Sequence, residues 1–171
     1  RMSWANEHGM VPPTQPGDDV GSRVVPVASK ECGSLGEVSK IYFLQINLQH
    51  SRIASAELCI RLSRLSRAVA IVQEPWVIKN SVVGLRGNGC NIFTGVVGSQ
   101  EKPRTCIVTK GITAVGLPQF GSADQTAVKI SYRKAGKNCE CAVASSYLPI
   151  TDKSVPASGL ERLTRDCKKS Q

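Results

Sequence analysis

The sequence is poor in aromatic residues and histidine, and it lacks several short patterns that identify enzymes directly. Aromatic side chains make up 5% of the 171 residues, and the two histidines are His8 and His50. The glycine-rich loops that bind nucleotide phosphates are absent, so we expect no small-molecule cofactor. Because Gly-x-Ser-x-Gly is also absent, a serine hydrolase is poorly supported. No apolar run approaches the roughly 20 residues of a membrane-spanning helix, and we expect no membrane partner.

The cysteines form no recognisable pairing pattern. There are seven, scattered along the chain without a Cys-x-x-Cys. Four of them lie in apolar stretches, namely Cys59, Cys90, Cys106 and Cys141. A free thiol in such a stretch behaves as a small hydrophobic group. We therefore predict no disulfide framework and an intracellular reducing compartment.

Positive charge is concentrated in one part of the chain. Lys and Arg number 22 against 13 Asp and Glu, which gives a net charge of +9. Residues 1–40 hold 4 basic and 5 acidic residues (net −1), so residues 41–171 hold 18 and 8 (net +10). Residues 1–40 also contain four prolines, five glycines and no periodic apolar pattern, which predicts a flexible leader or linker. A basic domain that begins at Ile41 favours a polyanionic partner such as nucleic acid.

The first ordered elements are predicted to be a strand, a helix and a second strand. The run from Ile41 to Asn47 is apolar almost throughout, as in a strand covered on both faces. Ser51 is a suitable helix N-cap. An apolar stripe at helical spacing follows it: Ala54, Leu58, Leu62, Leu65 and Val69. A second buried strand runs from Val69 to Glu74, and strands joined by a helix are expected to be parallel.

Short strands dominate the remainder. We predict strands over 91–97, 104–109, 112–115, 123–132 and 139–147, separated by breaks rich in Gly, Pro, Lys and Ser. Residues 134–138 resemble a hairpin turn, and such a meander favours antiparallel pairing. A last amphipathic segment extends from Ala157 to Cys167 and carries Leu160 and Leu163.

Two polar side chains stand at the ends of the first two strands. If these strands are parallel, Asn47 and Glu74 emerge at the same carboxyl edge, where α/β sheets usually bind ligands. A carboxylate beside an amide suits a hard cation such as Mg²⁺. The alternative is that Glu74 is simply exposed after a strand and Asn47 begins a turn.

Several segments together resemble a known family. They are Leu44–His50, Gln73–Trp76 (Gln-Glu-Pro-Trp), Arg104–Val108, Asp124–Lys129 and Ser146–Pro149. In this order they resemble the endonuclease domain of insect-type non-LTR retrotransposons, which belongs to the endonuclease/exonuclease/phosphatase superfamily and is similar in fold to deoxyribonuclease I. The resemblance covers Ile41 to Cys167. It implies an α+β fold, in which residues 41–171 form the N-terminal half of a four-layer α/β/β/α sandwich with a mixed sheet and at least one covering helix.

The resemblance also implies an activity and roles for individual residues. The family hydrolyses DNA phosphodiesters with Mg²⁺, nicking a chromosomal target to prime reverse transcription. Glu74 matches the metal-binding glutamate, Asn47 the asparagine that orders the metal and phosphate, and Tyr147 the tyrosine that contacts the phosphate. A reverse transcriptase domain in a parent polyprotein and a nuclear location are implied as well. His50 could contact backbone phosphate, but it does not match the catalytic histidine of the family.

The sequence departs from the family in one respect. The 171 residues contain neither the Gly-Asp-x-Asn segment that positions the attacking water nor the Ser-Asp-His segment. We therefore expect a truncated domain that is inactive alone, because general acid–base help is worth about 10²–10⁴-fold in rate. Two alternatives stay open, a basic nucleic-acid-binding module without catalysis and a non-functional retrotransposon remnant. Target-site preference, oligomeric state and the origin of residues 1–40 cannot be predicted from the sequence.

Overall fold

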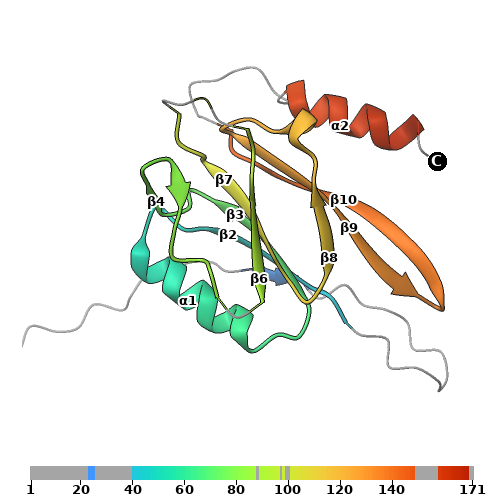
Figure 1. The fold of residues 1–171 in the computed structure, drawn as a ribbon, viewed down its shortest axis with the longest axis horizontal. Helices are drawn as coiled ribbons and strands as arrows, with labels where there is room; N and C mark the ends of the chain where they lie inside the picture. The colour runs from blue at the N-terminus through green and yellow to red at the C-terminus, as the bar shows by residue number, and fades with distance from the viewer. Residues whose placement is uncertain are drawn as a thin grey trace, which may run out of the picture.

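The described residues form four layers, in which two helices enclose the two larger β-sheets (Figure 1). The computed structural model describes residues 23–25, 40–87, 89–96, 98, 101–148 and 158–169. Helix α1 (Arg52–Ser63) covers a five-stranded sheet, a three-stranded sheet packs on its other face, and helix α2 (Ser158–Lys169) covers the outer face of the second sheet. The predicted α/β/β/α layering is confirmed. Neither helix is long and apolar enough to cross a membrane.

The five-stranded sheet is mixed, as predicted. Its order is β1–β2–β3–β7–β6, with bounds Arg23–Val25, Tyr42–Asn47, Ala68–Gln73, Thr105–Lys110 and Cys90–Thr94. Strands β2 and β3 are parallel, and the other three pairs are antiparallel. Strand β1 lies within the stretch that was predicted to be a linker. The rest of that stretch, apart from Lys40, is outside the described residues.

The second sheet contains the last three of the five strands in the predicted antiparallel meander. The first two, β6 and β7, pair with each other as predicted, but they belong to the first sheet, where β7 also pairs with β3. The order of the second sheet is β10–β9–β8, with bounds Lys137–Ser146, Gln125–Lys134 and Thr113–Gly116. Ala135 and Gly136 join β9 to β10 with φ of 49° and 78°, so the hairpin turn lies where the sequence predicted it. Three short elements were not predicted: β4 (Val77–Ile78), β5 (Ser81–Val82) and the 3-10 helix η1 (Pro118–Phe120).

Alternating side chains of the strands build a separate core on each face of the sheets. Leu44, Ala70 and Val72 pack toward Leu58 and Leu62 of α1. Their strand neighbours face the second sheet and form the inter-sheet core, which includes Val69, Ile107, Val128, Ile130 and Val143. A third cluster under α2 contains Phe120, Ala127 and Leu163. Both faces of β2 contact apolar neighbours, as predicted for a strand covered on both sides, although Tyr42 and Gln45 remain exposed.

Helix α1 begins where predicted and ends earlier. The Ser51 hydroxyl accepts a hydrogen bond from the Ala54 amide at 3.2 Å, which satisfies one free N–H of the first turn. The helix ends at Ser63, so Leu65 and Val69 lie beyond it, although they continue the helical spacing. The Lys110 ammonium group donates to the carbonyls of Leu62 and Ser63 at 2.8 and 3.0 Å. This cap comes from a distant strand, and helical periodicity does not indicate it.

The chain passes from the first sheet to the second through two residues, Gly111 and Ile112. Gly111 has φ of 60°, and a Cβ atom there would overlap the Ser66 carbonyl oxygen. Only glycine fits both the left-handed backbone and this close approach. All six cysteines of the described residues are free thiols, as predicted; Cys32 lies outside those residues.

Candidate functional site

The parallel pairing of β2 and β3 brings the first two predicted site residues to one edge. Asn47 is the register partner of Gln73, and Glu74 follows Gln73 directly. The Leu48 amide donates to the Gln73 carbonyl at 2.9 Å, which continues the ladder past the strand ends. The expectation that Asn47 and Glu74 share the carboxyl edge of two neighbouring strands is confirmed.

Glu74 has a backbone conformation that is unusual for a residue with a side chain. Its φ is 47°, in the left-handed region. Its amide donates to the Arg104 carbonyl at 2.8 Å, and its carbonyl accepts from the His50 amide at 2.8 Å. These bonds to two different segments hold the residue in place. Such conformations cost of order 1–3 kcal/mol and cluster at functional sites.

Asn47 begins a tight turn beside Glu74. Its side-chain oxygen accepts a hydrogen bond from the Gln49 amide at 2.8 Å. Gln49 and His50 both have positive φ, 48° and 55°. The His50 ring bonds through Nδ1 to the Pro75 carbonyl at 3.0 Å, which leaves Nε2 as its second polar atom. Asn47 can both begin this turn and bind a cation, because its side-chain oxygen has a second lone pair besides the one that accepts from Gln49.

Tyr147 comes from the second sheet and reaches Glu74. The Gln73 amide side chain donates to the Ser146 carbonyl at 2.7 Å, and the Ser145 hydroxyl donates to the Val72 carbonyl at 3.0 Å. These bonds join the ends of β3 and β10, so Glu74 and Tyr147 follow as neighbours. A hydrogen bond to the Glu74 carboxylate, together with its negative charge, raises the pKa of the Tyr147 hydroxyl.

An ion pair completes the site, and the sequence analysis had assigned no role to it. Arg104 pairs with Asp124, with Nη2 and Oδ2 2.6 Å apart. The guanidinium carbon of Arg104 lies 5.0 Å from the centre of the Tyr147 ring, a cation–π contact. The Tyr147 amide donates to the Asp124 carbonyl at 2.8 Å. Arg104 therefore contacts the Tyr147 ring directly, and it also binds Asp124, whose carbonyl accepts the hydrogen bond from the Tyr147 amide.

Strand direction is the signal that could have identified this pair. Strand β7 is antiparallel to β3, with Thr105 opposite Gln73, so the residue before β7 lies at the edge where β3 ends. Asp124 precedes β9 in the same way, and β9 is linked to β7 at this end by the Thr105 and Thr126 hydroxyls, 2.9 Å apart. Finding Arg104 and Asp124 from the sequence requires knowing which strands are neighbours.

The oxygen atoms of this edge suit a hard cation in type but are few. Glu74 supplies a carboxylate and Asn47 an amide oxygen, the kinds of donor that Mg²⁺ takes while it retains several waters. Asp124 is already paired with Arg104. No group of three or more His, Cys, Asp or Glu side chains suited to a metal occurs among the described residues. The residues therefore fit a Mg²⁺ ion that takes most of its ligands from water or substrate.

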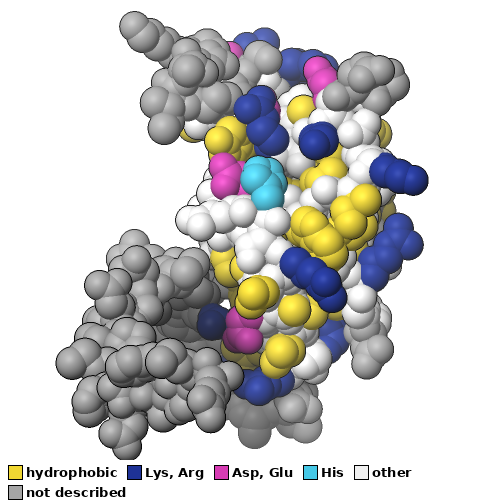
Figure 2. Space-filling model, turned by 90° about the vertical axis from the view of Figure 1, so that its left-hand side faces the viewer, with side chains coloured by type: hydrophobic (Ala, Val, Ile, Leu, Met, Phe, Trp, Pro, Cys, Tyr) yellow, Lys and Arg dark blue, Asp and Glu magenta, His cyan; other side chains and the backbone are white. Residues whose placement is uncertain are grey.

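Figure 2 shows a face of the molecule on which acidic side chains, a histidine and several Lys and Arg side chains lie close together above a hydrophobic area. Arg52 and Trp76 are close in sequence to the site, two residues after His50 and two residues after Glu74. The Arg52 guanidinium carbon lies 5.8 Å from the centre of the Trp76 indole ring. The mixture of both charge signs with aromatic rings is suited to a phosphate-containing ligand, whose charge needs cations and whose bases or sugars need apolar surface.

Comparison with known proteins gives a match in the solved structures. The match is the endonuclease domain of TRAS1, a telomere-specific non-LTR retrotransposon, with a TM-score of 0.54 and 23% sequence identity. The superposition covers 75% of this chain and 53% of that chain, so the present chain spans about half the length of the endonuclease domain. The likeness shows the fold and agrees with the resemblance seen in the sequence. No model of a known protein family and no curated protein matches the chain.

Proposed function

We propose that this chain supplies one half of the active site of a metal-dependent DNA endonuclease of the non-LTR retrotransposon type. The observation that carries the proposal is the contact between Glu74 and Tyr147 across the two sheets, beside Asn47. The likeness to the TRAS1 endonuclease domain supports the same assignment. In this proposal the substrate is nuclear DNA, and the nick primes a reverse transcriptase domain of the parent polyprotein.

Each residue has a distinct task in the proposed mechanism. Glu74 and Asn47 would hold the cation at the edge of the first sheet. The Tyr147 hydroxyl donates a hydrogen bond to the Glu74 carboxylate or to a phosphate oxygen. Arg104, which is ion-paired with Asp124, keeps the Tyr147 ring in position. A bound Mg²⁺ ion would neutralise the charge that develops on the phosphoryl oxygens and the leaving group.

The described side chains around Glu74 do not reproduce the set of groups that the resembled family uses to activate water. His50 lies beside Glu74 and bonds through Nδ1 to the Pro75 carbonyl, but it does not match the catalytic histidine of that family, and Asp124 is paired with Arg104. The 171 residues also lack Gly-Asp-x-Asn and Ser-Asp-His. We therefore propose that a polypeptide of these 171 residues binds the cation weakly and does not cut DNA.

A second candidate function is DNA binding without cleavage. The net charge of +10 over residues 41–171 favours it. Affinity for DNA that falls steeply with added salt is expected for such a module, because bound phosphates release counterions. Affinity that is independent of ionic strength contradicts this candidate.

The proposed cation site is tested by titrating the chain with Mg²⁺ and with Mn²⁺ as a spectroscopic probe. Replacing Glu74 by Gln removes the carboxylate and should abolish measurable binding. Glu140→Gln serves as the matched control, because Glu140 is an exposed carboxylate paired with Lys129 on the second sheet. Equal cation binding by the wild-type chain and the Glu74→Gln variant contradicts the proposed site.

The activity is tested by a nicking assay on supercoiled DNA with Mg²⁺. The 171-residue chain is expected to leave the DNA intact. Efficient nicking that is lost in the Glu74→Gln variant contradicts the claim that further residues are needed, while retaining the role of Glu74. Nicking that persists in that variant contradicts both claims.

A further inference from the structure

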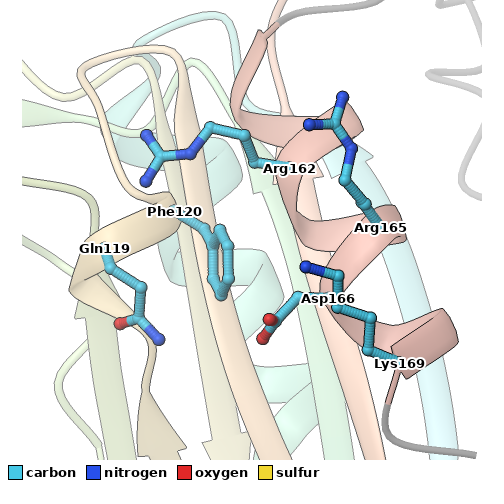
Figure 3. A pocket seen from close by; sticks show the side chains of 6 residues that line it. All are labelled: Gln119, Phe120, Arg162, Arg165, Asp166 and Lys169. Atoms are coloured by element: carbon cyan, nitrogen blue, oxygen red, sulfur yellow. The ribbon is translucent and has the colours of Figure 1, made fainter.

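A basic recess lies between η1 and α2, apart from the Glu74 site. Its volume is about 360 Å³, and its lining is Gln119, Phe120, Arg162, Arg165, Asp166 and Lys169. Figure 3 shows Arg162 and Lys169 extending from α2 into the gap opposite Gln119 and Phe120. Three cations and one carboxylate give the lining a net charge of +2. The lining thus has the sign that a phosphate requires.

The positive groups are arranged by the helix itself. Arg162, Arg165 and Lys169 are separated by three and four residues, so they lie along one face of α2. Leu163 of the same helix is buried against the second sheet and anchors it. The buried cluster of Phe120, Ala127 and Leu163 therefore fixes the basic face of α2 against η1 and the second sheet.

Phe120 positions one of the cations. The guanidinium carbon of Arg162 lies 6.0 Å from the centre of the Phe120 ring, and the ring is only 8% exposed. A planar guanidinium that rests on an aromatic ring keeps its N–H donors available at its edge. Such donors bind phosphate oxygens in pairs. Lys and Arg at a helix C-terminus also stabilise the helix dipole, but Arg162 lies in the middle of α2, where that effect has faded.

The recess lies close to the proposed cleavage site along the chain. Phe120 and Asp124 are four residues apart, so their Cα atoms are separated by at most about 14 Å. Asp124 pairs with Arg104 at the Glu74 site. A duplex advances 3.4 Å per base pair along each strand, so this reach corresponds to about four base pairs. The short connection from Phe120 to Asp124 therefore ties the recess to the segment that carries Asp124, which pairs with Arg104 at the Glu74 site.

We infer that the recess between η1 and α2 binds a backbone phosphate of duplex DNA a few base pairs from the phosphate at Glu74. This inference rests on the proposed function for the choice of DNA as the ligand. In it, the recess is a second anchoring point that holds the duplex and takes no part in cleavage. The contact is to the backbone, so it contributes affinity and register and no direct reading of base sequence.

The test measures binding of short labelled duplex DNA to the full chain by fluorescence anisotropy, in EDTA and at several salt concentrations. The double variant Arg162→Gln/Lys169→Gln is expected to weaken binding about tenfold and to make the salt slope about one unit shallower, because one phosphate contact is lost. The control Lys134→Gln/Lys137→Gln removes the same charge from the β9–β10 turn. It should change the affinity much less, because charges beyond about 8 Å are screened at physiological salt. Equal effects of the two double variants overturn the inference.

A measurement on the wild-type chain makes the test independent of the folding of any variant. Titration with the duplex should shift the NMR signals of the Arg162 side chain and of Gln119, and shifts confined to other regions overturn the inference. Single-stranded RNA of the same length is run in parallel. If only RNA binding depends on Arg162 and Lys169, the assignment to duplex DNA is overturned. Because EDTA removes divalent cations, failure here is separate from failure of the Glu74 cation site.

Discussion

Replacing Glu74 by glycine is expected to give a more stable protein than replacing it by alanine. Both changes remove the carboxylate and its contact with Tyr147, so the two variants differ at this position only in the backbone freedom of the residue. Glu74 has φ of 47° and is held there by hydrogen bonds to Arg104 and His50. Alanine must adopt the same left-handed conformation, while glycine does so without strain.

The size of the difference follows from two opposing effects. The left-handed conformation costs an L-residue about 1–2 kcal/mol. Glycine also loses more backbone freedom than alanine when the chain folds, which costs the glycine variant about 0.5–1 kcal/mol of stability. The glycine variant should therefore be more stable than the alanine variant by about 1 kcal/mol, or about 3 °C in Tm for a chain of this length.

Thermal and urea unfolding, monitored by circular dichroism, measure the difference between the two variants. The matched control is the pair Gln73→Gly and Gln73→Ala. Gln73 lies in β3 and does not have a positive φ, so glycine should be the less stable of that pair by about 0.5–1 kcal/mol. If Glu74→Gly is no more stable than Glu74→Ala, the left-handed conformation of residue 74 carries no strain and the reasoning is wrong.

Two further predictions concern titrating groups. Tyr147 should titrate above its ordinary pKa of 10.0, because of its hydrogen bond to Glu74 and the negative charge of that residue. Glu74→Gln should lower that pKa, as measured by tyrosinate absorbance with Tyr147→Phe as the reference, and an unchanged titration contradicts the contact. The stabilisation of the folded state is then present below pH 10.0 and is lost as the pH rises through the higher folded-state value. Burial raises the pKa of the Cys106 thiol to about 12, so a thiol reagent at neutral pH should label exposed Cys141 and Cys167 first and Cys106 only on unfolding. Labelling of Cys106 at the same rate as Cys167 contradicts its burial.

Local patterns in the sequence predicted most of the fold. The Ser51 cap, the parallel β2–β3 pair and the β9–β10 turn each depend on residues that are close in sequence, and all three are confirmed. The end of α1 was predicted too late, because Leu65 and Val69 continue its apolar spacing while Lys110 caps the helix at Ser63. The hairpin of β4 and β5 was missed because two-residue strands show no periodicity.

The site was predictable only in part for the same reason. Asn47 and Glu74 end strands that are connected by one helix, so their shared edge follows from local topology. Arg104 and Asp124 precede strands of two different sheets. Their pairing depends on how those sheets pack, which strand periodicity does not encode. The roles of Asn47, Glu74 and Tyr147 in catalysis stay predictions, although the structure brings Glu74 and Tyr147 into contact.

The close approach at Gly111 connects two distant parts of the first sheet. A side chain at position 111 would overlap the carbonyl oxygen of Ser66, which lies in the connection between α1 and β3. Any residue larger than glycine must therefore push the start of β3 away from the end of β7, although the two strands are paired along their whole length. Strand β3 ends at Gln73, directly before Glu74, so a substitution at position 111 acts on the strand that carries the proposed cation ligand from the end opposite that ligand.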